Sequence, residues 1–205
     1  MSSGPRKLVP RRNHNSLLEL VVIVAVAIGL ALLIQAFFIK PYRIPSESME
    51  PTLDVGQRVL VSRFNYHFSD PDRGDIVVFH PPKGADSNTC GAQKPEDQAC
   101  PRPTSEKDSV NFIKRIVAIP GDTLSIQQGH AIVNGKRQKD GFTTPCPPGT
   151  CNFPRKIKIP AGHFFMMGDN RGASDDSRFW GPVPKKWIIG QGFFTYWPVK
   201  RIGIL

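Results

Sequence analysis

Two serines stand two residues apart in the stretch IPSESMEPTL, residues 44–53. Pro45 and Pro51 restrict the backbone around them, so the two hydroxyls can be held in fixed positions. A serine hydroxyl becomes a nucleophile when a neighbouring base takes its proton. Ser46 and Ser48 are therefore candidates for nucleophilic chemistry, provided that the chain supplies a base.

Histidine is the first base to consider, but the five histidines of the sequence are scattered and the Gly-x-Ser-x-Gly pattern of hydrolases with a nucleophile elbow is absent. Lys114, in NFIKRIVAIPGD, is the other candidate. On a strand, Lys114 and Arg115 point to opposite faces, so one of them faces inward or toward a cleft. A lysine removed from water loses its proton more easily and can accept one from a serine. The alternative is a strand lysine whose amine reaches solvent.

A third polar segment, GDNRGASDDSRFWGP, covers residues 168–182 and follows an apolar strand. It is dense in Asp, Asn, Arg, Gly and Ser. Such a segment can be a plain solvated loop. Loops set on a rigid sheet are also where catalytic groups are often found, so both interpretations stand.

These segments follow an apolar run of 23 residues, Leu17 to Ile39. A helix of that length spans roughly 34 Å, which is enough to cross a bilayer. A cleaved signal peptide normally has a shorter apolar region, and a buried helix of a soluble protein is seldom apolar all round. The run therefore predicts a transmembrane anchor.

The net charge of +10 is explained in part by the cluster Arg6, Lys7, Arg11 and Arg12 just before this run. Basic residues on that side place the N-terminus in the cytoplasm. No nucleic-acid-binding motif accompanies the charge, so nucleic acid is not expected as a partner. The predicted organisation is a basic cytoplasmic tail over 1–16, an anchor over 17–39 and an extracytoplasmic domain over 40–205.

Short segments rich in β-branched and aromatic residues fill the exported part. The expected strands are RVLVSRF, DIVVFH, VNFIKRIVAI, a hairpin turning at Asn134-Gly135, RKIKI, HFFMM and WIIGQGFFTYW. No segment after Tyr42 has strong helical periodicity. The fold class is therefore mostly β, with antiparallel sheets behind a single N-terminal transmembrane helix. Two polar stretches, residues 81–108 and 143–154, are expected to be a surface insertion and a loop.

Four cysteines, Cys90, Cys100, Cys146 and Cys151, lie in the exported part. An even number in an oxidising compartment suggests two disulfides, and of the three possible pairings the short-range one is the simplest. Zinc is the rival explanation, but no Cys-x-x-Cys is present and the histidines have no ligand spacing. No metal site is expected.

The segments PSESMEPTL, GDIVVF, FIKRIVAIPGD and GDNRGASDDSRFWGPVP occur in the order of the sequence boxes of type I signal peptidases. The chain resembles that family from the anchor to Pro184. Its members are membrane-anchored Ser–Lys endoproteases that remove signal peptides from exported proteins. The resemblance implies a β catalytic domain, in agreement with the strand pattern.

The resemblance also implies a role for each matched residue. Ser48 matches the nucleophile and Lys114 the general base. Ser46 matches the side-chain donor of the oxyanion hole, shared with the Ser48 backbone N–H. Ser174 matches the hydroxyl that orients the lysine amine.

Two further points concern the surroundings of the dyad. Asp176 and Arg178 match a supporting ion pair near the site. Glu47 departs from the family, which often has glycine there, and a carboxylate leaning toward Lys114 would hold the lysine charged. The insertion with Cys90 and Cys100 lies outside the family boxes.

The implied reaction is signal-peptide cleavage through an acyl-enzyme, with small residues at the first and third positions before the cut and no metal or organic cofactor. The implied partners are signal peptides and membrane lipid, and the implied location is the plasma membrane.

A self-cleaving Ser–Lys repressor is one alternative, but it would need a DNA-binding segment in place of the anchor. A membrane-tethered β domain that has lost activity is the remaining alternative.

Overall fold

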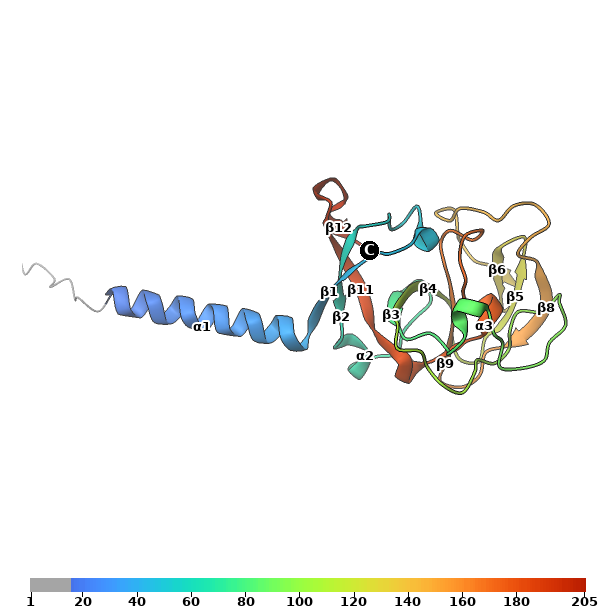
Figure 1. Cartoon of the computed structure of the whole chain (residues 1–205), viewed down its shortest axis with the longest axis horizontal. Helices are drawn as coiled ribbons and strands as arrows, with labels where there is room; N and C mark the ends of the chain where they lie inside the picture. The colour runs from blue at the N-terminus through green and yellow to red at the C-terminus, as the bar shows by residue number, and fades with distance from the viewer. Residues whose placement is uncertain (1–15) are drawn as a thin grey trace, which may run out of the picture. The chain divides into compact units, whose positions relative to one another are not determined.

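A computed structural model describes residues 16–205, with the side chains of residues 34–37 left aside. The basic cluster at Arg6, Lys7, Arg11 and Arg12 lies outside the described residues. The chain divides into two compact units, one ending at Phe37 and the other covering Phe38–Leu205 (Figure 1). Each unit is described by itself.

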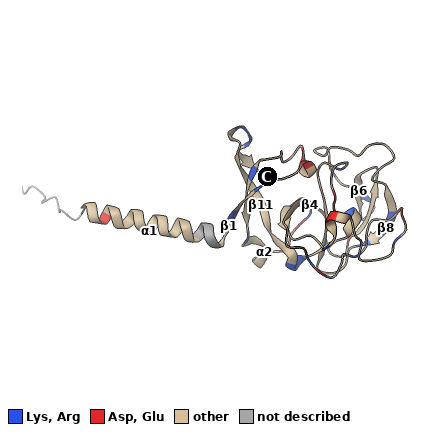
Figure 2. Cartoon of the chain, in the orientation of Figure 1, with Lys and Arg blue, Asp and Glu red and all other residues tan. Residues whose placement is uncertain are grey.

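The first unit is the helix α1, Ser16–Phe37. Glu19 in its first turn is its one charged residue (Figure 2). Its side chains from Ser16 to Leu33 are exposed, so this stretch is not a buried core helix, and it is long and apolar enough to cross a membrane. The predicted run extends two residues beyond the helix, because Ile39 already belongs to a strand.

The second unit is built on an antiparallel sheet that contains most of its strands, which confirms the mostly β prediction. Figure 1 shows the long strand β11 crossing this sheet. In spatial order the strands are β1 (Ile39–Arg43), β2 (Arg58–Ser62), β11 (Ile188–Trp197), β3 (Ile76–Phe79), β4 (Phe112–Ala118), β9 (His163–Met167) and β10 (Val183–Pro184), with β12 (Gly203–Ile204) paired to β11.

A second antiparallel sheet forms the other end of this unit (Figure 1). Its strands are β7 (Lys136–Arg137), β6 (His130–Val133), β5 (Thr123–Gln127) and β8 (Phe153–Lys158). The expected hairpin is present, and Asn134 and Gly135 both have positive φ at its turn, as this turn chemistry requires. Two four-residue helices, α2 (Asn65–Phe68) and α3 (Ser177–Trp180), complete the α-helices of the described residues.

The central strands are apolar on both faces because each face meets a different part of the core. In β3, Val77 and Phe79 pack into one cluster with Trp180, whereas Ile76 and Val78 pack into another with Met49. β4 lies beside β3, with Lys114 opposite Val77. Lys114 and Arg115 are thus placed inside a sheet buried on both sides, where a charged group is costly unless it is paired or neutralised.

The four cysteines form two disulfides, Cys90–Cys100 and Cys146–Cys151. These are the short-range pairs, so no cysteine is left as a thiolate for zinc or as a nucleophile. The insertion is less superficial than its composition suggests, since Ala85, Ala99 and Cys100 are buried. It contains one short 3₁₀ turn, η2 (Ala85–Ser87), and its Cys100 N–H donates to the Arg178 carbonyl on α3.

Candidate active site

The two serines lie on a short loop between β1 and β2 that is anchored by buried apolar residues. Ile44, Met49 and Leu53 are almost completely buried in one core cluster. The single 3₁₀ turn η1, Glu47–Met49, carries Ser48, which is itself buried, whereas Ser46 is exposed. The Ser46 and Ser48 hydroxyl oxygens are 3.3 Å apart.

Lys114 reaches this loop from β4. Its Nζ donates a hydrogen bond to Ser48 Oγ at 2.5 Å, and both side chains are buried. Burial lowers the pKa of Lys114 to about 8, against the opposing charges of Asp176, Asp175 and Asp169. A lysine of this kind releases its proton far more readily than a free lysine, so the pair has the geometry of a nucleophile and its base.

Arg115, the next residue, points to the other face of β4 as the strand geometry requires. Its guanidinium binds the fully buried carboxylate of Asp169 through Nε at 2.9 Å and through Nη2 at 2.7 Å. Thr52 donates to the same carboxylate at 2.6 Å. Asp169 therefore ties β4 to the loop that carries Ser48.

A buried ion pair between Asp176 and Arg178 supports the loop over residues 168–182. The Arg178 Nε and Nη2 atoms lie 2.7 and 2.8 Å from the carboxylate oxygens, and neither side chain has exposed surface. Burial opposes ionisation of Asp176, but the charge and hydrogen bonds of Arg178 outweigh it and hold the pKa of Asp176 below its usual value. Arg178 also donates to the carbonyls of Arg171 and Ser174, which fixes the turn between them.

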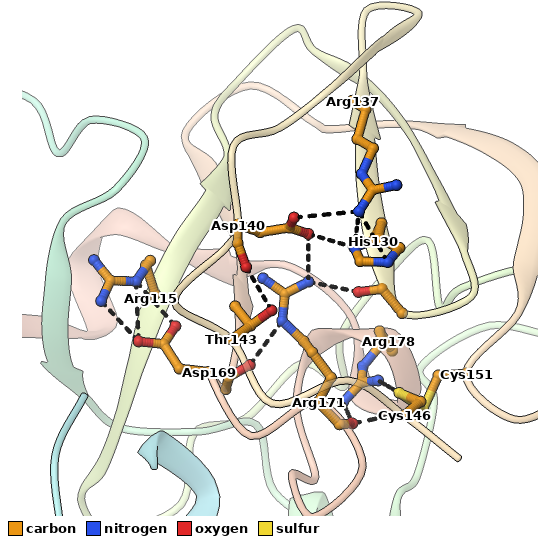
Figure 3. A network of polar contacts seen from close by, with 12 residues as sticks. Arg115, His130, Arg137, Asp140, Thr143, Cys146, Cys151, Asp169, Arg171 and Arg178 are labelled. Atoms are coloured by element: carbon orange, nitrogen blue, oxygen red, sulfur yellow. Dashed lines mark hydrogen bonds and ion pairs between the residues drawn. A yellow bond between two sulfur atoms is a disulfide. The ribbon is translucent and has the colours of Figure 1, made fainter. Parts of the chain in front are cut away.

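Figure 3 shows Arg171 between Asp140 on one side and Arg178 with the Cys146–Cys151 disulfide on the other. Arg171 is buried and donates to the carbonyls of Gly168 and Gly129. Burial lowers the pKa of Arg171. The loop over residues 168–182 is thus held in place by arginine side chains that donate hydrogen bonds to backbone carbonyls.

The same loop holds the backbone of Ser48. Asn170 N–H donates to the Ser48 carbonyl at 3.1 Å, and Asn170 Nδ2 donates to the Glu47 carbonyl at 3.3 Å. The Glu47 side chain is exposed and is not among the charges that shift the pKa of Lys114.

The structure brings the predicted site residues together around the Ser48–Lys114 contact, but Ser174 does not hydrogen-bond to the Lys114 amine as expected. Its hydroxyl is buried but has no hydrogen-bond partner among the described residues, and the Lys114 amine points to Ser48 instead. Sequence reasoning flagged the loop over 168–182 without assigning roles to Asp169, Asn170 and Arg171. Only the density of polar residues directly after an apolar strand could have pointed to them.

A cavity of about 300 Å³ opens over the dyad. It is lined by Pro45, Ser46, Ser48, Asn111, Phe112, Ile113, Lys114, Ala173 and Asp175. A second cavity of about 340 Å³ shares four of these residues and is otherwise bounded by Tyr42, Arg43, Ile44, Val78 and Val110. Within residues 16–205, no group of three or more His, Cys, Asp or Glu side chains is placed to hold a metal ion.

The strand that supplies Lys114 also has a free edge beside the cavity. β3 pairs with β4 from Phe112 to Arg115, but β9 pairs with it only from Arg115 onward. In the described part of the chain, Phe112 to Lys114 therefore have no strand partner on the second side. An extended peptide can add to such an edge through main-chain hydrogen bonds.

Known proteins are similar in sequence to this chain over most of its length. The sequence pattern of the family described as "Signal peptidase, peptidase S26" matches residues 17–197. A signal peptidase I of Leptolyngbya laminosa is 38% identical over 92% of this chain and 84% of its own length. A probable signal peptidase I-2 of Synechocystis is 36% identical over 94% of this chain and 78% of its own length.

Among solved structures, a signal peptidase I of Enterococcus faecalis is similar, with 23% identity and a TM-score of 0.38 over 60% of this chain and 97% of that one. The family pattern spans the apolar helix, the serine loop, β4 and the loop over 168–182. It thus covers each element that contributes to the Ser48–Lys114 pair. The chain belongs to the peptidase S26 family of signal peptidases.

Proposed function

We infer that this protein is a serine endopeptidase that cleaves signal peptides from exported precursor proteins, with Ser48 and Lys114 as its catalytic dyad. The observation that carries the assignment is the 2.5 Å contact between the Lys114 amine and the Ser48 hydroxyl, inside a family of signal peptidases. A buried lysine bonded to a buried serine has little structural purpose unless the lysine can lose its charge.

The reaction begins when neutral Lys114 takes the proton of Ser48 and the alkoxide attacks the carbonyl before the cut. The oxyanion is stabilised by the Ser48 N–H and the Ser46 hydroxyl, and one such donor contributes about 3–4 kcal/mol. Lys114 then protonates the leaving amine. A water activated by the same lysine hydrolyses the ester and frees Ser48.

Two further positioning roles belong to this proposal. The buried Ser174 hydroxyl has no partner within residues 16–205, so it is free to accept a hydrogen bond from the Lys114 amine while Ser48 is esterified. The Asp176–Arg178 pair balances the carboxylate behind Lys114 with a cation, so that the carboxylate does not hold the lysine charged.

The cleavage-site preference follows from the two cavities. The substrate chain adds to the free edge of β4 and places alternate side chains on the same side. The catalytic cavity and the second cavity would then receive the first and third residues before the cut, and because the two share Pro45, Asn111, Phe112 and Ile113, a small side chain in each leaves room for the other.

The helix α1 anchors the enzyme in the plasma membrane in this proposal. Its 22 residues would span roughly 33 Å, close to the thickness of a bilayer core. The basic residues before it place the tail in the cytoplasm and the β domain outside. Lipid is thus a partner of the anchor.

The pH dependence of cleavage follows from the pKa of Lys114. Because the base works in its neutral form and has a pKa of about 8, only about one molecule in ten is competent at pH 7. We expect kcat/KM to rise about tenfold per pH unit below pH 8 and to level off above it. The test is to measure kcat/KM of the full-length enzyme on one precursor between pH 5 and pH 10. A profile that is flat between pH 6 and pH 9 contradicts it.

Gly168 provides a test of how closely the two loops must approach. A Cβ at this position would overlap Ser174 Oγ and the Ser48 carbonyl oxygen. Gly168→Ala therefore must displace the nucleophile, and a displacement of about 1 Å can cost on the order of 100-fold in rate. Gly141→Ala is the matched control, since its Cβ meets nothing within 4 Å. Equal kcat/KM for the two folded variants would show that the approach is unimportant.

A turnover assay on a precursor with small residues at the first and third positions before the cut tests the function itself. We expect cleavage after the first of these positions by the wild type and none by Ser48→Ala, Lys114→Ala or Lys114→Arg. Arginine fails because it keeps its proton at working pH. Circular dichroism establishes that each variant is folded. Folded Lys114→Arg protein that cleaves near the wild-type rate rules out the lysine base, and inactive wild type leaves the tethered, inactive domain as the explanation.

The topology is tested by protease added to intact spheroplasts. We expect digestion of the β domain, because it faces outward, with the tail and the anchor spared. Permeabilised cells provide the control, in which the tail is digested as well. Full protection of the β domain in intact spheroplasts is the result that refutes this orientation.

A further inference from the structure

The insertion over residues 81–108 is docked on the β domain, and it contacts a residue that lines the catalytic cavity. Asp108 N–H bonds to the Pro81 carbonyl and closes its base, while Cys100 N–H bonds to the Arg178 carbonyl on α3. Its backbone at Arg102 and Pro103 packs so closely on Gly181 that a Cβ there would lie 2.7 Å from Arg102. The insertion therefore sits in a fixed position against the loop that supports the dyad.

One side chain of the insertion contacts the cavity wall. Asn88 Nδ2 donates to Asp175 Oδ1 at 2.8 Å, across 87 residues of sequence. Asn88 has a φ of 52°, which asparagine tolerates better than most residues, and it follows the short turn Ala85–Ser87 whose first residue is buried. The contact orients one carboxylate oxygen of Asp175, and the other accepts no hydrogen bond from residues 16–205.

Asp175 also determines the charge of the cavity. Among the nine residues that line it, only Lys114 and Asp175 are ionisable. The carboxylates behind the cavity are each paired with an arginine, Asp176 with Arg178 and Asp169 with Arg115. Asp175 has no cationic partner within 4 Å among the described residues. When Lys114 is neutral, as the proposed mechanism requires, the lining carries one unbalanced negative charge.

The position of Asp175 indicates which part of the substrate meets this charge. The second cavity, of about 340 Å³, shares Pro45, Asn111, Phe112 and Ile113 with the catalytic cavity, but not Asp175. Asp175 belongs to the unshared end, with Ser48 and Lys114. If the apolar residues before the cut occupy the shared end of the catalytic cavity, the substrate chain after the cut runs past Asp175.

We propose that Asp175, oriented by Asn88, is a specificity-determining residue that binds a cationic side chain in the first two residues after the cut. This inference rests on the proposed function and adds to it a preference on the leaving side. An ion pair of partly exposed groups of this kind changes a rate constant by about fivefold at most. It acts on substrate choice rather than on the chemical steps.

The test uses full-length enzyme and precursors that differ only at one position after the cut, carrying Lys, Gln or Glu at the first or second position. The measured quantity is the ratio of kcat/KM for Lys to that for Glu. Any change that Asp175 makes to the Lys114 base cancels in this ratio, because both substrates use the same base. We expect wild type to prefer Lys over Gln and Gln over Glu, each by up to about fivefold, and to lose much of this preference at high salt.

The variants separate the charge of Asp175 from a structural role. Asp175→Asn should bring the ratio close to one, and Asp175→Lys should invert it. Asn88→Gly, which suits the positive φ, should reduce the ratio because Asp175 loses the hydrogen bond that orients it. Asp86→Asn is the matched control, since it removes an exposed carboxylate of the same insertion that does not line the cavity, and it should keep the wild-type ratio.

Each outcome bears on the proposal. A wild-type ratio near one, with the Gln substrate cleaved normally, overturns the proposal and leaves the proposed function intact. A ratio that survives Asp175→Asn, or a dependence on Asp175 only for charges placed before the cut, also overturns it. Wild-type enzyme that cleaves none of the substrates contradicts the proposed function, and this inference with it.

Discussion

The removal of the Lys114 amine from water is the constraint on which the rest of the structure depends. Burial is the largest influence on its pKa, and it acts against the charges of Asp176, Asp175 and Asp169. Two of these carboxylates are needed to hold loops together, and each is paired with an arginine. Arg178 lowers the pKa of Lys114, and without it the same carboxylates would stabilise the ammonium further and oppose the proposed role of Lys114 as a base.

The second requirement is that segments far apart in sequence keep a fixed distance. Ser48, Lys114 and Gly168 belong to three segments, and their contacts depend on main-chain atoms as much as on side chains. Asn170 holds the Ser48 carbonyl, and Gly168 gives the room for that approach. Main-chain contacts of this kind show how a loop of polar residues can hold the Ser48 backbone in place.

The sequence predicts the strands well because their alternation and their turn residues are local signals. It also points to Ser48 and Lys114 as the proposed dyad, since the order of the boxes carries information about the whole family. It does not reveal that Ile39 begins a strand, because an apolar residue after an apolar helix has no distinguishing pattern. Nor does it reveal which arginine pairs with Asp169, or that Asn88 meets Asp175, because such contacts depend on how distant segments pack.

The neighbours Lys114 and Arg115 show how a doubly buried strand can contain two basic residues in succession. Arginine keeps its proton at any physiological pH, so Arg115 is stable there only with a carboxylate, and Asp169 supplies it. A buried lysine can instead lose its charge, and the Lys114 amine contacts a serine hydroxyl rather than a carboxylate. The different partners on the two faces of β4 therefore follow from the different acidities of the two side chains. The same difference suits Arg115 to a structural ion pair and Lys114 to its proposed role as a base.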